Sequence, residues 1–472
     1  MSSILAIDLG TSRIKAALFA PDGAMTALSS RRLDRAASPE IQDAEDWFTV
    51  STELIRELTA RTAAEVDALV LTGNMHALLG IDRDGVPVAP ARLWSDNSAE
   101  LEAEELNRRY GKRLLDDFGC SAIPVFTLPK IMQMKNHQPE QYRRTEVFLQ
   151  SKDYLNFRLT GAMVTDPTDA SGVLGMNLRT REWSGDFFRD LGIDESKLPE
   201  ILPSASIGGK LSAEAAALTG LRQGTPVVTG SGDLASAALG SGVNERTMSL
   251  TLGTAGQLLA AGSPGTGAKL AGKLFVFAHA DPEQELYLGS VPAGGFSFEW
   301  FARVHNISME DFFRLAQAAP LEEKLPIFYP YILGKGAPSM DYTPCGAWKD
   351  LSADHSLGKL CRAAVFGTLC PLRICADLLE RCAGPRRELV LQALACREAA
   401  VRETAGALFT QEKSLPLNSE ASLLGAAVIG FTALGNCRSI AEAAAVMVKK
   451  RPADLGHTEV AEHLFGRFGN GF

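Results

Sequence analysis

The chain has 472 residues, enough for two or three domains that each bury a core, so a small disulfide-stapled scaffold is excluded. Hydrophobic residues make up 46% and charged residues 22%, which is typical of a folded, soluble protein and unlike a disordered chain. The formal net charge is −9, from 47 Lys and Arg against 56 Asp and Glu, and this balance argues against non-specific binding to nucleic acid or anionic membranes.

The first 32 residues predict a β-hairpin and a third strand. Residues 4–10 and 14–20 are apolar runs separated by a Gly-Thr-Ser turn, and Met25–Leu28 reads as a further strand. A helix with an acidic first turn is expected over 43–64, followed by a buried strand over 66–73. Antiparallel strands followed by helix and strand in alternation indicate an α/β layered domain.

An internal repeat organises the rest of the chain. After a helical and mixed stretch over about 98–220, the strand PVVTGSGD ends at Asp233, and RTMSLTLGTAGQLLAAG then repeats the opening hairpin. Two similar domains facing each other would bring both turns to a shared cleft, where α/β proteins bind ligands; chance similarity of two short hairpins is the alternative. The predicted boundary lies near 238–247 and gives domains of residues 1–243 and 244–472. Further elements are expected at 355–382 (helix), 388–394 (strand) and 422–434 (helix).

Cysteine usage and the N-terminal segment predict a cytoplasmic protein. The eight cysteines include no Cys-x-x-Cys pair and no zinc-ligand spacing with histidine, so we expect free buried thiols in a reducing compartment. No basic region precedes the first apolar run, and no stretch approaches about 18 uncharged apolar residues. We therefore expect neither a targeting nor a membrane segment.

Two glycine turns and two carboxylates suggest phosphate chemistry. Gly10–Ser12 and Gly253–Ala255 are strand-to-strand turns whose backbone N–H groups and hydroxyls suit anionic oxygens. Asp8 ends a buried strand, and phosphoryl transfer needs magnesium held mostly through water by one or two carboxylates; a turn or cap carboxylate is the alternative. Asp233 precedes a small-residue helix expected at Leu234–Leu239, where it can be the helix N-cap, a general base for a substrate hydroxyl, or both.

Two polar segments suit a carbohydrate. Asn74, Met75 and His76 follow the strand at 66–73 and could grip a polyol, although a lone histidine is more often structural. Trp94 and Asp96 place an aromatic face beside a carboxylate, which suits a sugar ring or chain. The alternative is a half-buried tryptophan beside a solvated aspartate.

An ordered set of segments resembles one known family. AIDLGTSRIKAALF, TGNMHALL, ARLWSDNS, VFTLPKIMQMKNHQPE, LQSKDYLNFRLTG, VTDPTDASG, GSGDLASAALGSG, SLTLGTAGQL, GGFSFEWF, FYPYILGKGAP and LLGAAVIG, spread over about residues 4–430, resemble the FGGY family of carbohydrate kinases. The resemblance implies an α/β fold of two ribonuclease H-like domains of the actin, hexokinase and Hsp70 type. It also implies ATP in an interdomain cleft, with the sugar beneath it on the N-terminal domain.

The resemblance assigns roles to individual residues. It implies Asp233 as the catalytic base and Asp8, together with Asp233, as the magnesium site. The implied nucleotide-binding residues are Gly10, Thr11, Ser12, Lys15, Gly253, Thr254, Ala255, Ala393, Leu394 and Gly425, and the implied substrate-binding residues are Asn74, Met75, His76, Trp94, Asp96 and Asp233.

The implied substrate is a ketose. Asn74–His76 matches a Gln-Met-His stretch of xylulokinase-like members, which favours a ketopentose such as xylulose. The sequence Gly232-Asp233-Leu234 with Ser236 is also similar to sedoheptulokinase-like members, so a seven-carbon ketose or another polyol stays open. A homodimer is a further expectation from the family.

The sequence departs from the family pattern mainly around the expected adenosine site. A glycine-rich turn is replaced by Gln392–Ala395, an Arg and Thr by Lys335–Ala337 before Pro338, an Arg by Asn97–Ser98, and a helical Glu by Phe366. Side chains at 392–395 could crowd the nucleoside. Because the phosphate and base positions are intact, a kinase with unusual nucleotide affinity or preference is favoured over a non-catalytic sugar- or nucleotide-binding homologue.

Overall fold

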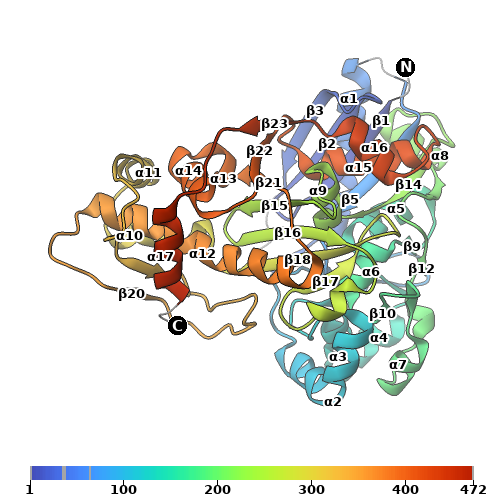
Figure 1. Cartoon of the computed structure of the whole chain (residues 1–472). Coiled ribbons are helices and arrows are strands. Elements are labelled where there is room, and N and C mark those ends of the chain that lie inside the picture. Colours follow the sequence, from blue (N-terminus) through green and yellow to red (C-terminus); the bar gives the residue numbers. More distant parts are fainter. Residues whose placement is uncertain (1–2, 34–38, 63–64, 470–472) are drawn as a thin grey trace. The chain divides into compact units, whose positions relative to one another are not determined.

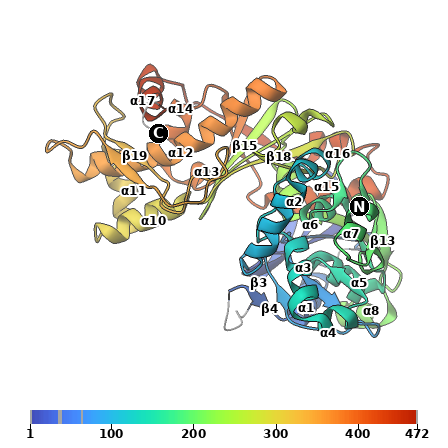
Figure 2. The same ribbon diagram turned by 90° about the horizontal axis from the view of Figure 1, so that it is seen from below.

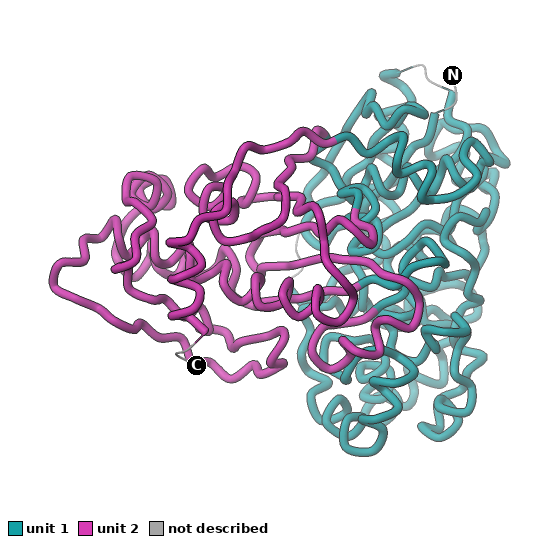
Figure 3. Tube along the Cα trace, in the orientation of Figure 1, with its two compact units in different colours: residues 1–242, 277–286, 418–449 teal, residues 243–276, 287–417, 450–472 magenta. Residues whose placement is uncertain are grey.

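The computed structural model describes residues 3–33, 39–62 and 65–469, and the chain divides into two compact units (Figure 3). Unit 1 comprises Met1–Gly242, Phe277–Leu286 and Asn418–Lys449. Unit 2 comprises Val243–Val276, Tyr287–Leu417 and Lys450–Phe472.

Unit 1 is built on a six-stranded mixed sheet in the order β13-β14-β5-β1-β2-β3 (Figure 1). β1 pairs antiparallel with β2 and parallel with β5, and β14 continues parallel to β5 on the other side. The predicted hairpin and third strand are therefore confirmed. The strands are β1 (Ile4–Leu9), β2 (Arg13–Phe19), β3 (Met25–Arg32), β5 (Ala68–Gly73), β13 (Ile207–Lys210) and β14 (Pro226–Gly232).

Helices cover both faces of this sheet. On one face α1 (Ala44–Thr62) and α5 (Ser151–Thr160) bury Trp47 and Tyr154 against it. On the other face lies α15 (Ala421–Ala433), which is apolar around its whole circumference because it packs between the sheet and α9 (Asp233–Gly240). The result is the α/β layered arrangement expected from the sequence.

The remaining elements of unit 1 are short strands and further helices. Figure 2 shows α2, α3, α6 and α7 with this unit. They are β4 (Ile41–Gln42), β6 (Leu79–Ile81), β7 (Ala91–Arg92), α2 (Glu100–Phe118), α3 (Thr127–His137), α4 (Pro139–Arg144), β8 (Val147–Leu149), β9 (Val164–Thr165), α6 (Pro167–Val173), β10 (Met176–Asn177), β11 (Glu182–Trp183), α7 (Gly185–Asp190), η1 (Glu195–Lys197), β12 (Glu200–Ile201), α8 (Ala213–Thr219) and α16 (Ile440–Met447).

The core sheet of unit 2 repeats the topology of the unit 1 sheet. β15 pairs antiparallel with β16 and parallel with β21, as β1 does with β2 and β5. Leu252 lies opposite Ala393 in the same way that Leu9 lies opposite Gly73. The internal repeat predicted from the two hairpins is therefore a repeat of sheet topology, not a chance likeness. The seven strands, in sheet order, are β17 (Phe275–Ala278), β18 (Glu285–Val291), β16 (Gly256–Gly262), β15 (Thr247–Leu252), β21 (Glu388–Ala393), β22 (Glu412–Pro416) and β23 (Lys450–Ala453).

The helices of unit 2 pack around α12 (Leu357–Ala383), which contains Pro371 and buries most of its residues. The predicted helix at 355–382 is thus confirmed within two residues at each end. The other elements are η2 (Thr266–Lys269), α10 (Gly295–Val304), α11 (Met309–Ala318), β19 (Ile327–Tyr329), β20 (Ala347–Lys349), α13 (Leu394–Arg397), α14 (Ala399–Leu408) and α17 (Glu459–Gly469).

Two segments from the second half of the chain, Phe277–Leu286 and Asn418–Lys449, belong to unit 1. The domain boundary at residue 243 stays a prediction. The first segment is held by Arg181, whose guanidinium donates to carbonyl oxygens at 279, 281, 282 and 284. The second carries α15, whose apolar surface needs the unit 1 sheet. Both segments therefore belong to unit 1 because the residues that they contact lie in its first 242 positions.

His279 makes stability depend on pH. It is fully buried, its Nδ1 accepts a hydrogen bond from the Asp281 N–H at 3.0 Å, and burial lowers its pKa from 6.5 to about 4. The unfolded chain therefore takes up a proton first as pH falls, so this stabilisation is present above pH 6.5 and is lost towards pH 4. From pH 7 to 5 the expected loss is about 2 kcal/mol.

The measurement is urea unfolding at pH 7 and pH 5. His279→Gln is expected to lose less stability between the two pH values than the wild type, whereas His137→Gln, at an exposed position, should follow the wild type. An equal pH dependence in all three proteins would contradict the prediction.

All eight cysteines are free thiols in the structure. Cys120, Cys361, Cys370 and Cys375 are buried as expected, and the other four are partly exposed. Over the described part of the chain, no helix combines the length and apolarity needed to cross a membrane.

Candidate active site

Three parallel strands of unit 1 end at the same level, and this brings several predicted residues together. Leu9, Gly73 and Gly232 are paired across β1, β5 and β14. The next residues along the chain are Gly10, Asn74 and Asp233. The carboxyl edge of the sheet thus gathers the first phosphate turn, the start of the polar trio and the candidate base.

Asp8 lies on β1, directly before this edge. Its cross-strand neighbour is Lys15, and the Lys15 ammonium pairs with Glu420 at 2.6 Å. The pKa of Asp8 is raised from 3.8 to about 7, first by burial and then by the charge of Asp233, while Lys15 lowers it and Glu420 raises it. Asp8 therefore faces more negative than positive charge, which a bound cation would relieve.

Asp233 is the first residue of α9 and is not its N-cap. The N-cap is Gly232, which has no side chain to bond the helix, so the N-cap interpretation is wrong. Burial raises the pKa of Asp233 from 3.8 to about 6, while a backbone hydrogen bond from Leu234 lowers it. A carboxylate with a pKa in this range is well matched to general base catalysis near neutral pH.

The residues fit magnesium by donor chemistry. Asp8 and Asp233 offer hard carboxylate oxygens, and each raises the local negative charge. Magnesium binds through one or two carboxylates and otherwise keeps water and substrate phosphates as ligands. Within the described residues no cluster of three or more His, Cys, Asp or Glu side chains could hold a metal by itself.

Two side chains donate hydrogen bonds to Thr11 in the Gly10–Ser12 turn, and the sequence did not predict these contacts. Trp94 Nε1 donates to Thr11 Oγ1 at 2.9 Å, and Gln42 Nε2 donates to the Thr11 carbonyl at 2.6 Å. Trp94 keeps 49% of its surface exposed. The indole thus links the predicted phosphate turn to the predicted sugar segment.

In unit 2, the Gly253–Ala255 turn is backed by the start of α10. Gly295 N–H donates to the Gly253 carbonyl at 2.7 Å, and Gly294 N–H donates to the Thr254 carbonyl at 3.0 Å. A Cβ on Gly294 would lie 2.3 Å from the nearest backbone atom, so only glycine allows this close approach. The GGF segment seen in the sequence therefore shapes the second predicted phosphate turn.

The polar trio is divided between structural and accessible groups. Asn74 is buried and donates from Nδ2 to the Leu9 carbonyl at 2.9 Å, and Met75 is buried beside Gly232. His76 has a φ of 65°, an uncommon conformation for a non-glycine residue, and keeps a partly exposed side chain. Of the three, His76 is the one best placed to meet a ligand.

His76 is neutral near pH 7. Burial lowers its pKa from 6.5 to about 4, and its Nδ1 lies 2.8 Å from the Gly172 carbonyl. Because a carbonyl only accepts, Nδ1 carries the hydrogen in a neutral ring and Nε2 is left as an acceptor. Phe126 and Phe277 flank the ring. A hydroxyl donor of a carbohydrate matches this acceptor.

Lys130 is a residue of the candidate site whose role the sequence did not predict. Its buried ammonium donates to the His76 carbonyl at 3.0 Å and to the Leu93 carbonyl at 2.6 Å. It therefore ties the His76 segment to the Trp94 segment.

Asp96 is buried and already paired. Arg92 Nε donates to Asp96 Oδ2 at 2.6 Å, and the Ser98 N–H donates to Oδ1 at 2.9 Å. The solvated aspartate of the alternative interpretation is wrong. Asp96 can still orient the loop that carries Trp94, and its contact with sugar stays a prediction.

Gly425 is required by helix packing. It lies where α15 crosses α9, and a Cβ there would lie 1.8 Å from the Ser236 carbonyl oxygen. Its predicted contact with nucleotide stays a prediction, but the close helix crossing is sufficient to explain the glycine.

Ala393 occupies a backbone conformation that favours glycine, with φ 51° and ψ −125°. Replacing it with Gly is expected to stabilise unit 2 by about 1 kcal/mol, because relief of the strain outweighs the extra flexibility of the unfolded chain. Ala395→Gly, at a buried position in α13 on the same turn, should destabilise instead. Urea unfolding of both variants tests the opposite signs.

The same variant tests the crowding hypothesis for the nucleoside. If the Ala393 methyl group crowds a bound nucleoside, Ala393→Gly lowers the KM for ATP. In the unfolding experiment, an Ala393→Gly protein that is no more stable than the wild type would show that the positive φ of Ala393 is not strained.

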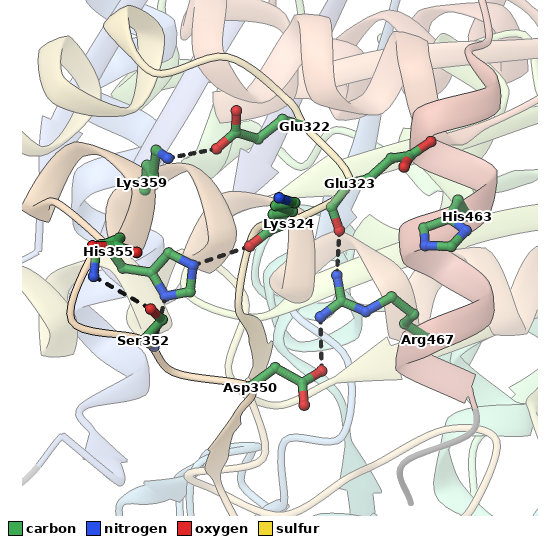
Figure 4. Close-up of a pocket in the computed structure, with 10 residues that line it drawn as sticks. Glu322, Glu323, Lys324, Asp350, Ser352, His355, Lys359, His463 and Arg467 are labelled. Atoms are coloured by element: carbon green, nitrogen blue, oxygen red, sulfur yellow. Dashed lines mark hydrogen bonds and ion pairs between the residues drawn. The ribbon is translucent and has the colours of Figure 1, made fainter.

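A separate groove in unit 2, with a volume of about 560 Å³, is lined by charged side chains (Figure 4). Lys359 pairs with Glu322 at 2.7 Å, and Arg467 pairs with Asp350 at 2.7 Å. His355 contacts the Lys324 carbonyl. Since these charges pair with one another, the groove offers no clear preference for an anion or a cation.

The chain resembles carbohydrate kinases in both sequence and fold. The N-terminal domain of the FGGY family of carbohydrate kinases matches residues 3–240, and its C-terminal domain matches residues 280–434. A xylulose kinase of Bacillus subtilis is 31% identical over 78% of this chain and 75% of its own length, and a gluconokinase of the same organism is 26% identical over 93% and 89%. The crystal structure of a protein described as a xyloylose kinase from Brucella ovis superposes with a TM-score of 0.92 at 23% identity, covering 99% of this chain and 98% of that one, which shows a shared fold.

Proposed function

Because the chain belongs to the FGGY family of carbohydrate kinases, we propose that it transfers the γ-phosphoryl group of ATP to a primary hydroxyl of a ketose, most favourably a ketopentose such as xylulose. The observation that carries the proposal is that Asp8 and Asp233 lie at one sheet edge, close enough for the charge of Asp233 to raise the pKa of Asp8, with His76 presenting an acceptor nitrogen in the same unit. Asp8 and Asp233 suit phosphoryl transfer, and His76 suits carbohydrate binding.

Asp233 is the proposed general base. Its carboxylate accepts the proton of the sugar hydroxyl as the hydroxyl oxygen bonds to the γ-phosphorus, and the bond from that phosphorus to the bridging oxygen of ADP breaks. Asp8 and Asp233 would hold magnesium, which would supply positive charge to the phosphates. Thr11, Ser12 and Thr254, in their two turns, are the proposed phosphate contacts.

The sugar is positioned by groups that are themselves fixed. His76 Nε2 accepts a substrate hydroxyl because Nδ1 is committed to Gly172. Lys130 holds the backbone of His76 and of the Trp94 segment, so the two segments keep their spacing. A fixed acceptor lowers the entropic cost of orienting the substrate.

The test is a coupled assay with ATP, Mg²⁺ and a panel of xylulose, ribulose, sedoheptulose, glycerol and gluconate. We expect xylulose to give the highest kcat/KM, at least about tenfold above the other compounds, a margin that corresponds to about 1.4 kcal/mol of transition-state binding. Absence of turnover above Asp233→Ala on every compound would refute the enzyme proposal and favour a non-catalytic sugar- or nucleotide-binding homologue. Faster turnover of sedoheptulose or gluconate than of xylulose would replace the ketopentose as the proposed substrate.

A cytoplasmic location and a homodimer stay predictions. Cell fractionation tests the location, and light scattering of the purified protein tests the oligomeric state.

A further inference from the structure

A buried polar network lies behind the end of β14. Lys152 Nζ is 2.6 Å from Asp153 Oδ1, 3.1 Å from Asp166 Oδ1 and 3.2 Å from Asp169 Oδ2, and all four side chains are buried. Asp166 caps α6, a short helix whose residues are all buried. Burying this much charge is costly unless close ion pairs and hydrogen bonds offset the loss of hydration.

A chain of hydrogen bonds runs from this network to the backbone beside the candidate base. The Gly232 N–H donates to Thr168 Oγ1 at 2.8 Å, and the Thr168 hydroxyl donates to Asp166 Oδ2 at 2.8 Å. Ser204 also donates to Asp166 Oδ2, at 2.7 Å. Because the single hydroxyl hydrogen of Thr168 goes to the carboxylate, its lone pair is directed at the Gly232 amide.

The backbone at Gly232 has little freedom on its other side. A Cβ there would lie 2.6 Å from Met75 Cγ and 3.0 Å from Asp169 Oδ1. Gly232 is the last residue of β14, and Asp233 follows it. The position of the Asp233 Cα is therefore set by a glycine that is packed on one side and hydrogen-bonded through Thr168.

The other end of α6 reaches the carbohydrate side of the site. The Gly172 carbonyl contacts His76 Nδ1 at 2.8 Å, and a Cβ on Gly172 would lie 2.9 Å from Met75 Cε. One short buried helix thus contacts the residue before the base and the histidine that presents the acceptor.

We propose that Thr168 is a positioning residue for Asp233, an inference that rests on the proposed function. Its hydroxyl donates to Asp166, a carboxylate that pairs with Lys152, and it holds the Gly232 amide. It thereby sets the distance from the Asp233 carboxylate to the substrate hydroxyl. A misplacement of about 1 Å in a reacting pair can cost about 100-fold in rate. Loss of the Thr168 hydroxyl therefore acts on kcat more than on sugar affinity.

The test compares Thr168→Val, which has nearly the same shape and no hydroxyl, with Thr168→Ser, which keeps the hydroxyl. We expect Thr168→Val to lower kcat about 10- to 100-fold while the sugar Kd, measured by calorimetry without ATP, changes less than about threefold. Thr168→Ser should restore kcat to within about threefold of wild type. The matched control is Thr219→Val on α8, another buried threonine of unit 1, which bonds to the Ala215 carbonyl.

Amide exchange at Gly232 gives a readout that needs no turnover. It should accelerate at least about tenfold in Thr168→Val and stay slow in Thr168→Ser and Thr219→Val. An unchanged exchange rate in Thr168→Val, or a Ser variant as impaired as Val, would overturn the proposal. Wild-type enzyme inactive on the whole panel would instead refute the proposed function, and the exchange rates alone would then decide whether Thr168 holds this amide.

Ser204→Ala covers the case in which Thr168→Val does not fold. It removes one of the hydrogen bonds to Asp166 and leaves Thr168 in place. We expect a kcat about 3- to 10-fold below wild type, with the sugar Kd unchanged. A kcat equal to that of wild type would count against the network.

Discussion

Replacing Asp233 with Asn is expected to lower kcat about 10³-fold while the protein stays folded and still binds sugar. Asn has nearly the same shape as Asp but cannot accept a proton at neutral pH, so the variant isolates the base function. The wild-type carboxylate has a pKa raised by burial to about 6, which leaves it mostly ionised at pH 7.5. The activity of the wild type should therefore fall as pH drops through about 6, in step with protonation of this group.

The control is Asp186→Asn, an exposed aspartate in the first turn of α7. It should retain wild-type kcat, because Asp186 lies on the surface and pairs with Arg113. Calorimetry should show that Asp233→Asn binds sugar within about tenfold of wild type. A kcat for Asp233→Asn within tenfold of wild type would remove Asp233 as the base.

The sequence was sufficient to predict the parts of the site that are local. A strand, a glycine turn and a second strand are encoded in a few consecutive residues, so the positions of Asp8 and Gly10–Ser12 at the end of β1 could be predicted. The repeat of this pattern at Gly253–Ala255 predicted the second sheet for the same reason. Parallel pairing then placed Asn74 and Asp233 at the same edge.

The sequence could not predict contacts that join distant segments. Nothing near Arg181 indicates that it holds carbonyl groups a hundred residues later, and nothing near α15 indicates that its partner is the first sheet. Thr168 and Lys130 look like ordinary members of their helices until the backbone groups they contact are known. Each interaction depends on tertiary packing, which overrides local pattern.

The departures from the family pattern have different physical meanings. At Ala393 the backbone keeps a conformation that favours glycine although the side chain has changed, which makes the turn strained. Asn97–Ser98 lies beside Asp96, and Arg92 supplies the guanidinium partner from four residues before that carboxylate. A departure from the family pattern can therefore leave a strained backbone, as at Ala393, or lie beside a carboxylate that is already paired, as at Asp96.

Replacing Asp8 with Asn is expected to lower activity at least about 100-fold and yet stabilise the metal-free enzyme at pH 8. The loss of activity follows from removing a carboxylate that would hold magnesium. The gain in stability follows from the charge balance, since burial and the Asp233 charge raise the Asp8 pKa to about 7 against an ordinary value of 3.8. An ionised Asp8 is therefore destabilising in the metal-free protein.

The sign of the pH dependence follows from that shift. The folded protein holds the Asp8 proton more tightly than the unfolded chain, so this stabilisation is fully present below pH 3.8 and is lost as pH rises through about 7. Between pH 5.5 and 8 the loss is about 2 kcal/mol for this group. Asp233, with a pKa of about 6, adds a smaller change of the same sign that persists in Asp8→Asn.

The measurement is the Tm in EDTA and in Mg²⁺ at pH 5.5 and pH 8. At pH 8 in EDTA, Asp8→Asn should melt about 3 °C or more above wild type, and Mg²⁺ should stabilise wild type more than the variant. Asp22→Asn is the control, because Asp22 is exposed and a backbone hydrogen bond from Ala24 lowers its pKa. Its removal should not raise the Tm. If Asp8→Asn melts below wild type at pH 8, or keeps full activity, the carboxylate pair is structural and the magnesium site must be sought elsewhere.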